Sequence, residues 1–144
     1  MKNKLMLLLL LLVGAVSSSQ NWVTDIDVAK KIASEENKKI ILVFQGSDWC
    51  APCIKLDHEI WSTSEFKEYA KDHYVMLKAD FPRSKKNALP KEQQIKNGKL
   101  AEKYNKNGYP PPLVVILDKT GKALGMTGYK KISPNEYIAK INSF

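Results

Sequence analysis

Three mostly apolar runs dominate the pattern of hydrophobic and polar positions along the chain, at residues 39–44, 74–79 and 113–117. Short apolar runs bounded by turn residues are typical of strands that are buried on both faces of a sheet. A fourth strand is expected over 122–127. The Asp-Lys-Thr-Gly sequence at 118–121 forms a turn that lets the chain reverse directly after the third run.

The segments between these runs carry apolar residues at the spacing of amphipathic helices. Thr24 with Asp27 resembles a capping box for the first helix, and Asn97-Gly98 is expected to interrupt the fourth. Ser133, followed by a proline and by Glu136, marks the start of the last helix. The expected helices cover 25–37, a stretch beginning at Cys50, 63–71, 91–103 and the residues after Ser133, with a polar loop at 81–90.

The resulting order of elements is α-β-α-β-α-β-β-α. This order predicts an α/β fold with a central mixed β-sheet flanked by helices on both faces. The helices between strands predict parallel crossovers, whereas the short turn at Gly121 predicts an antiparallel pair. Internal repeats and an interdomain linker are both absent from the sequence, so a single domain is expected.

Residues 1–19 follow a different pattern. Lys2 and Lys4 precede a nearly continuous apolar run at 5–13, and small residues follow up to Ser19. This pattern predicts a signal peptide at 1–19, cleaved after Ser19, and a mature domain at 20–144. The apolar run is shorter than the about 20 residues that span a bilayer. An uncleaved membrane anchor is the alternative.

The chain is basic, with 23 Lys and Arg against 15 Asp and Glu and a formal net charge of +8. Arg83 is the only arginine, whereas proteins that read nucleic acids depend heavily on arginine for bidentate contacts. Aromatic residues are not interleaved with a basic stripe. We therefore interpret the lysines as a solvated surface and expect no nucleic-acid partner.

The chain has only two cysteines, Cys50 and Cys53. A disulfide that closes so small a loop removes little entropy from the unfolded chain, so the spacing favours redox chemistry over a structural staple. The strand, turn and helix around Cys50 place it at a helix N-terminus, where free N–H groups and the helix dipole stabilise a thiolate. Cys50 can then attack a disulfide and Cys53 can resolve the product. A redox-inert module with a static disulfide remains an alternative.

A metal site is the other alternative. Zinc needs four ligands, and Cys50, Cys53, His58 and His73 are the His and Cys residues available. On one helix, Cys50 and His58 would lie about 12 Å apart, too far for one coordination shell unless the helix breaks. Covalent haem attachment requires His directly after Cys53, where the chain has Ile54. We therefore expect no metal and no bound cofactor.

Residues 43–53, with Trp49 before the first cysteine and Ala51-Pro52 between the two, resemble the active-site segment of the thioredoxin superfamily. Residues 108–115 resemble the loop of that family that carries a cis proline. Pro112 takes the cis-proline place, and Pro111 is the next candidate. Together with the Asp-Phe-Pro-Arg stretch at 80–83, the pattern over 22–144 is most similar to exported bacterial thioredoxin-like proteins.

The resemblance implies a thioredoxin-like fold, with Cys50 as nucleophile and Cys53 as resolving cysteine. It places Trp49, Pro111 and Pro112 at the substrate groove. Two departures from the family pattern change this picture: Leu113 replaces the usual threonine after the cis proline and makes the groove more apolar, and Phe44 replaces a buried aspartate that helps to deprotonate the resolving cysteine. Carboxylates that are candidates for an alternative proton route are Asp48, Glu59 and Asp80. For Asp48, capping of the helix is the other interpretation.

The implied function is a periplasmic thiol–disulfide oxidoreductase that reduces disulfides in exported proteins. The reducing direction is favoured because no cationic residue lies between the cysteines to over-stabilise the thiolate; an oxidase or isomerase of the same fold is the alternative. The expected partners are exported proteins with cysteines or disulfides and a membrane thiol–disulfide electron donor. The protein is expected to be a monomer.

Overall fold

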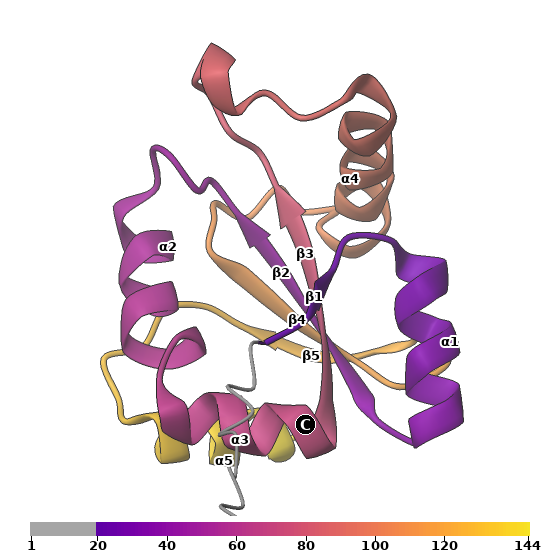
Figure 1. The fold of residues 1–144 in the computed structure, drawn as a ribbon, viewed down its shortest axis with the longest axis vertical. Helices are drawn as coiled ribbons and strands as arrows, with labels where there is room; N and C mark the ends of the chain where they lie inside the picture. Colours follow the sequence, from indigo (N-terminus) through magenta and orange to yellow (C-terminus); the bar gives the residue numbers. More distant parts are fainter. Residues whose placement is uncertain (1–19) are drawn as a thin grey trace, which may run out of the picture.

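The computed structural model describes residues 20–144 (Figure 1). The predicted signal peptide at 1–19 lies outside the described residues, so both it and the domain boundary stay predictions. The described chain contains a sheet of five strands in the order β1-β3-β2-β4-β5. The strands are β1 (Trp22–Val23), β2 (Lys39–Gln45), β3 (Tyr74–Asp80), β4 (Leu113–Leu117) and β5 (Ala123–Thr127).

The sheet is mixed, as predicted. Strand β3 pairs in parallel with β1 and β2, whereas β4 pairs in antiparallel fashion with both β2 and β5. The sequence pattern predicted four of these strands to within two residues. It missed β1, because a strand of two residues is too short to produce a recognisable alternation.

Helices cover both faces of the sheet, which confirms the predicted architecture (Figure 1). One face is covered by α1 (Ile26–Glu36) and α4 (Lys91–Tyr104). The other face is covered by α2 (Ala51–Leu56) with the π-helical turn η1 (Asp57–Trp61) that continues it, α3 (Ser64–His73) and α5 (Pro134–Asn142). A short 3₁₀ turn, η2 (Lys85–Asn87), lies within the predicted loop at 81–90.

Strand β2 lies between the two cores, as its continuous apolar run predicted. Its side chains alternate: Ile41 and Val43 pack on the α2–α3–α5 face, and Ile40, Leu42 and Phe44 pack on the α1–α4 face. All five are almost completely buried. The strand that leads to the cysteines is therefore held from both sides.

The helix between β3 and β4 does not make the expected parallel crossover. Asp80, at the end of β3, pairs with Gln45, and Leu113, at the start of β4, pairs with Phe44. The end of β3 and the start of β4 therefore lie at the same end of the strands. The connection through α4 returns to the end that it left, so β4 runs antiparallel to β3. This topology brings the loop before β4 to the end of β2, where the redox motif begins.

Two expectations about the helices are wrong and one is confirmed. Asp25, not Thr24, caps α1, because its carboxylate accepts hydrogen bonds from the N–H groups of Asp27 and Val28 at 2.8 and 3.2 Å. Helix α4 continues without interruption through Asn97-Gly98. The predicted capping box at Ser133 is present at the start of α5.

Asn97 is a buried polar residue within α4. Its side chain is 1% exposed, donates to the Asp80 carbonyl at 2.9 Å and accepts from Gln93 Nε2 at 2.8 Å. The amide therefore ties the helix to the end of β3 and does not break it. A Cβ added at Gly98 would meet nothing within 4 Å.

We expect opposite effects from alanine at these two neighbouring positions. Asn97→Ala leaves the Asp80 carbonyl without its side-chain donor and should lower the free energy of unfolding by about 1–3 kcal/mol. Gly98→Ala removes backbone entropy from the unfolded chain and should raise the free energy of unfolding by about 0.5–1 kcal/mol. Urea denaturation of both variants measures the difference; a stabilising Asn97→Ala would contradict the buried tie.

Candidate functional site

Cys50 lies where β2 passes into α2. The chain turns after β2 with a hydrogen bond from the Cys50 N–H to the Gly46 carbonyl at 2.9 Å. Cys50 is the N-cap residue of α2 and forms a disulfide with Cys53, with 5.3 Å between the two Cα atoms. The two cysteines are 4% and 5% exposed. The site therefore combines a nearly buried pair of sulfurs with a helix start.

The capping contact at Cys50 involves its sulfur. Cys53 donates its backbone N–H to Cys50 Sγ, with an N···S distance of 3.3 Å. In the reduced protein the same donor would face the sulfur that becomes the thiolate, and a hydrogen bond to a thiolate favours that form. This donor supports the prediction that Cys50, rather than Cys53, carries the more stabilised thiolate.

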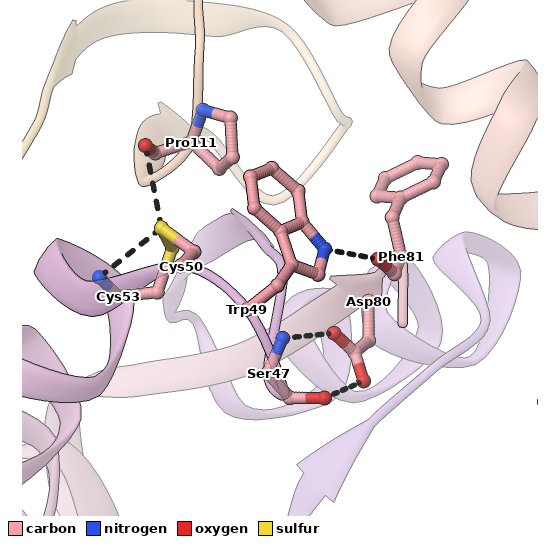
Figure 2. Close-up of a disulfide and its surroundings, with 7 residues drawn as sticks. All are labelled: Ser47, Trp49, Cys50, Cys53, Asp80, Phe81 and Pro111. Atoms are coloured by element: carbon pink, nitrogen blue, oxygen red, sulfur yellow. Dashed lines mark hydrogen bonds between the residues drawn. A yellow bond between two sulfur atoms is a disulfide. The ribbon is translucent and has the colours of Figure 1, made fainter. Parts of the chain in front are cut away.

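The loop before β4 forms the opposite wall of the site. The Pro111–Pro112 peptide bond is cis, so the cis proline lies at Pro112, the first of the two expected candidates. The Pro111 carbonyl oxygen lies 3.5 Å from Cys50 Sγ. Figure 2 shows the carbonyl pointing toward the sulfur. Because residues 110–112 are all proline, this stretch of the wall has no backbone N–H groups and its backbone offers only acceptors.

Trp49 flanks the sulfurs on a second side. Its indole N–H donates to the Phe81 carbonyl (Figure 2), with a distance of 2.8 Å. The ring also covers Gly46 so closely that a Cβ there would overlap it. The guanidinium carbon of Arg83 lies 3.6 Å from the centroid of the indole ring. Trp49 remains 36% exposed, so one part of its ring is accessible beside the disulfide.

Asp48 does not cap α2, contrary to one of the two sequence interpretations. Its carboxylate accepts hydrogen bonds from the N–H groups of Arg83 and Ser84, both at 2.9 Å, and from Asn87 Nδ2 at 3.0 Å. These bonds hold the pKa of Asp48 below its usual range, and the bond from the Arg83 N–H contributes most. Asp48 therefore anchors the loop at 81–87 to the redox motif.

The other two candidate carboxylates are also engaged. Asp80 accepts from the N–H and the hydroxyl of Ser47, at 2.9 and 2.6 Å. Glu59 accepts from the hydroxyl of Tyr129 at 2.6 Å, and this bond raises the pKa of Tyr129. Within residues 20–144, no hydrogen bond joins Asp48, Glu59 or Asp80 to a cysteine sulfur. A proton route through any of them stays a prediction.

Phe44, at the place of the family's buried aspartate, is 3% exposed and stacks on Phe81 with 6.5 Å between ring centroids. The apolar ring supplies no acid at this position. Its contact with Phe81 instead helps to fix the segment whose carbonyl receives the Trp49 indole.

Comparison with known proteins identifies the family. The model of a family described as thioredoxin-like matches residues 21–119. This chain belongs to the thioredoxin-like family. A solved structure described as a DsbH oxidoreductase superposes with a TM-score of 0.78 at 34% identity, and the match covers 87% of this chain and 83% of that one.

Two Chlamydia pneumoniae proteins are similar in sequence. The disulfide bond reductase DsbH is 39% identical over 111 residues, which cover 77% of this chain, and the thioredoxin-related protein DsbJ is 25% identical over 101 residues, which cover 70% of it. The chain spans 64% of the length of the first protein and 28% of the second.

The contacts of Asp48 and Trp49 with the loop at 81–87 in this thioredoxin-like chain do not follow from its sequence pattern. The Asp-Phe-Pro-Arg stretch was part of the family resemblance, yet its contacts with Asp48 and Trp49 join residues more than 30 positions apart. Among the described residues, no three His, Cys, Asp or Glu side chains gather as a metal site would require. No helix in this part of the chain is long and apolar enough to cross a membrane.

The anchoring role of Asp48 generates a proteolysis prediction. Asp48→Ala removes the acceptor for three hydrogen bonds from the loop, so trypsin should cleave after Arg83, Lys85 and Lys86 about fivefold faster or more. Mass spectrometry of timed digests identifies the cut sites.

Asp118→Ala is the matched control. Asp118 accepts hydrogen bonds from Thr120 and Lys122 in the turn before β5. Its loss should expose Lys119 and Lys122 to trypsin and leave the loop at 81–87 unaffected. Unchanged cleavage of that loop in Asp48→Ala would contradict the anchor.

Proposed function

We propose that this chain is a thiol–disulfide oxidoreductase that is exported to the periplasm and reduces disulfides in other exported proteins. One observation carries the proposal: Cys50 and Cys53 form a disulfide within one helical turn, with the Cys50 sulfur at the helix start and opposite the Pro111 carbonyl. Trp49, Pro111 and Pro112 form the walls of the groove that receives the substrate.

The reaction exchanges one disulfide for another. The Cys50 thiolate attacks one sulfur of a substrate disulfide; a bond forms between Cys50 and that sulfur, the substrate S–S bond breaks, and the other substrate sulfur leaves as a thiolate. Cys53 then loses its proton and attacks Cys50 Sγ. The Cys50–Cys53 disulfide forms, the second substrate thiolate leaves, and two electrons have moved from the protein to the substrate.

The residues between the cysteines support the reducing direction. Ala51 and Pro52 carry no charge, and Pro52 has no N–H to donate to a thiolate. The two residues between the cysteines therefore add nothing to the stabilisation of the reduced form that makes a dithiol protein a strong oxidant. The similarity to the disulfide bond reductase DsbH points in the same direction.

The proposal includes a location and a source of electrons. Export is supported by the signal-peptide pattern at 1–19 and a mature domain at 20–144. Because the periplasm is kept oxidising, the Cys50–Cys53 disulfide must be reduced again by a dithiol donor, which we place in the membrane. The protein acts as a monomer without a bound cofactor.

Trapping of covalent intermediates tests the proposal. Cys53→Ser removes the resolving thiol, so complexes between Cys50 and exported cysteine-containing proteins should accumulate on non-reducing gels and disappear with dithiothreitol. Cys50→Ser should form none, because Cys53 is not the attacking residue.

The variant with both cysteines replaced by serine provides the background. Complexes on Cys50→Ser alone would reverse the two roles. If neither single variant forms complexes with substrates that the intact protein reduces, the dithiol mechanism is contradicted.

A further inference from the structure

Arg83 lies beside the site, where Asp48 and Trp49, the two residues before Cys50, hold it. Its backbone N–H donates to Asp48, two residues before Cys50, and its guanidinium carbon lies 3.6 Å from the centroid of the Trp49 ring. The Phe81 carbonyl, two residues earlier, receives the Trp49 indole N–H. A cation is therefore fixed over the residue that directly precedes the nucleophile.

The charge of Arg83 is unpaired in the part of the chain that the structure describes. It takes part in none of the salt bridges there, and its side chain makes no hydrogen bond. The adjacent Asp48 carboxylate is already occupied by backbone N–H groups and an amide. The indole face attracts the cation. The five N–H donors of the guanidinium lie in its own plane, however, and the indole ring accepts a hydrogen bond from none of them.

Further positive charge lies beside Arg83. Lys85 and Lys86 are exposed in the same anchored loop and form no salt bridge among residues 20–144. Arg83, the only arginine of the chain, is thus one of three cations near two carboxylates, Asp48 and Asp80, both of which already accept hydrogen bonds. Together these groups have a net positive charge that a substrate would meet next to Cys50.

We propose that Arg83 is a specificity-determining residue that binds an acidic side chain close to the disulfide of the substrate. The inference rests on the proposed function and names the class of substrate for the same site. The planar guanidinium can bind a carboxylate through two parallel hydrogen bonds. Its stacking on Trp49 reduces the entropy lost on binding, while Lys85 and Lys86 increase the rate of encounter with acidic segments.

The first chemical step provides the assay. Full-length mature Cys53→Ser protein is mixed with peptides whose single cysteine is joined by a disulfide to 2-thiopyridine. Cys50 attacks the peptide sulfur, a Cys50–peptide disulfide forms, the bond to thiopyridine breaks, and pyridine-2-thione is released and measured by its absorbance. Three peptides carry Glu, Ser or Lys on both sides of the cysteine.

We expect the Glu peptide to react fastest and the Lys peptide slowest at low ionic strength. Arg83→Gln should lower the ratio of the Glu rate to the Ser rate by about threefold, which is the size expected for an exposed ion pair. Arg83→Lys should keep part of the preference because it keeps the charge. About 0.5 M salt should remove most of the preference in the unsubstituted protein.

Lys119→Gln is the matched control for the loss of one positive charge. Lys119 lies in the turn after β4, at the opposite end of the sheet, because Leu117 pairs with Ile40 whereas Leu113 pairs with Phe44. This variant should leave the Glu-to-Ser ratio unchanged. Alkylation of Cys50 by the uncharged reagent iodoacetamide reports any change in thiolate reactivity that Arg83→Gln causes for all substrates alike.

The outcomes distinguish a failure of the specificity role of Arg83 from a failure of the proposed function. An unchanged Glu-to-Ser ratio in Arg83→Gln, or an equal slowing of all three peptides, would reduce Arg83 to a packing residue for Trp49 and overturn the inference. Failure of the Cys53→Ser protein to react with any peptide would refute the proposed function, and the inference with it. Loss of the ratio alone, with the Ser peptide unaffected, supports both.

Discussion

The hydrogen bond from the Cys53 N–H to the sulfur of Cys50 couples the fold to the chemistry. A sulfur takes the capping place that a side-chain oxygen usually occupies at a helix start, so the helix gains an acceptor and the sulfur gains a donor. The contact requires that α2 begin at Cys50. That start depends on β2, which is buried on both faces, and on the turn in which Gly46 accepts the Cys50 N–H.

The connection through α4 supplies the rest of the site. This connection leaves β3 and enters β4 at the same end of the strands. The loop with the cis Pro111–Pro112 bond therefore reaches the end of β2, where the Pro111 carbonyl lies 3.5 Å from Cys50 Sγ. The segment after β3 lies at the same end, where Asp48 and Trp49 bind it. Two segments distant in sequence therefore meet the residues around Cys50: the Pro111 carbonyl approaches the sulfur, and the segment after β3, which carries the unpaired cation, binds Asp48 and Trp49.

The sequence predicted those parts of the structure that depend on local patterns. The buried strands followed from apolar runs, the last helix from its capping box at Ser133, and the place of the cis proline from the family resemblance. The direction of β4, the role of Asn97 and the partners of Asp48 were missed or wrong. Each depends on contacts between distant residues: Asn97 is paired with the Asp80 carbonyl and Asp48 with the Arg83 N–H. Polar residues that look like helix breakers or caps can instead form hydrogen bonds that tie distant elements together.

The reduction potential of the Cys50–Cys53 pair decides whether this protein reduces or oxidises its substrates. With one backbone donor at the Cys50 sulfur and no charged residue between the cysteines, the account predicts a potential more reducing than about −180 mV, the region of disulfide isomerases. Equilibration of the pure protein with glutathione buffers of known ratio, followed by quantification of the thiols, gives the value. A potential near −120 mV, typical of strong disulfide oxidants, would mean that electrons flow from substrates to this protein and would contradict the account.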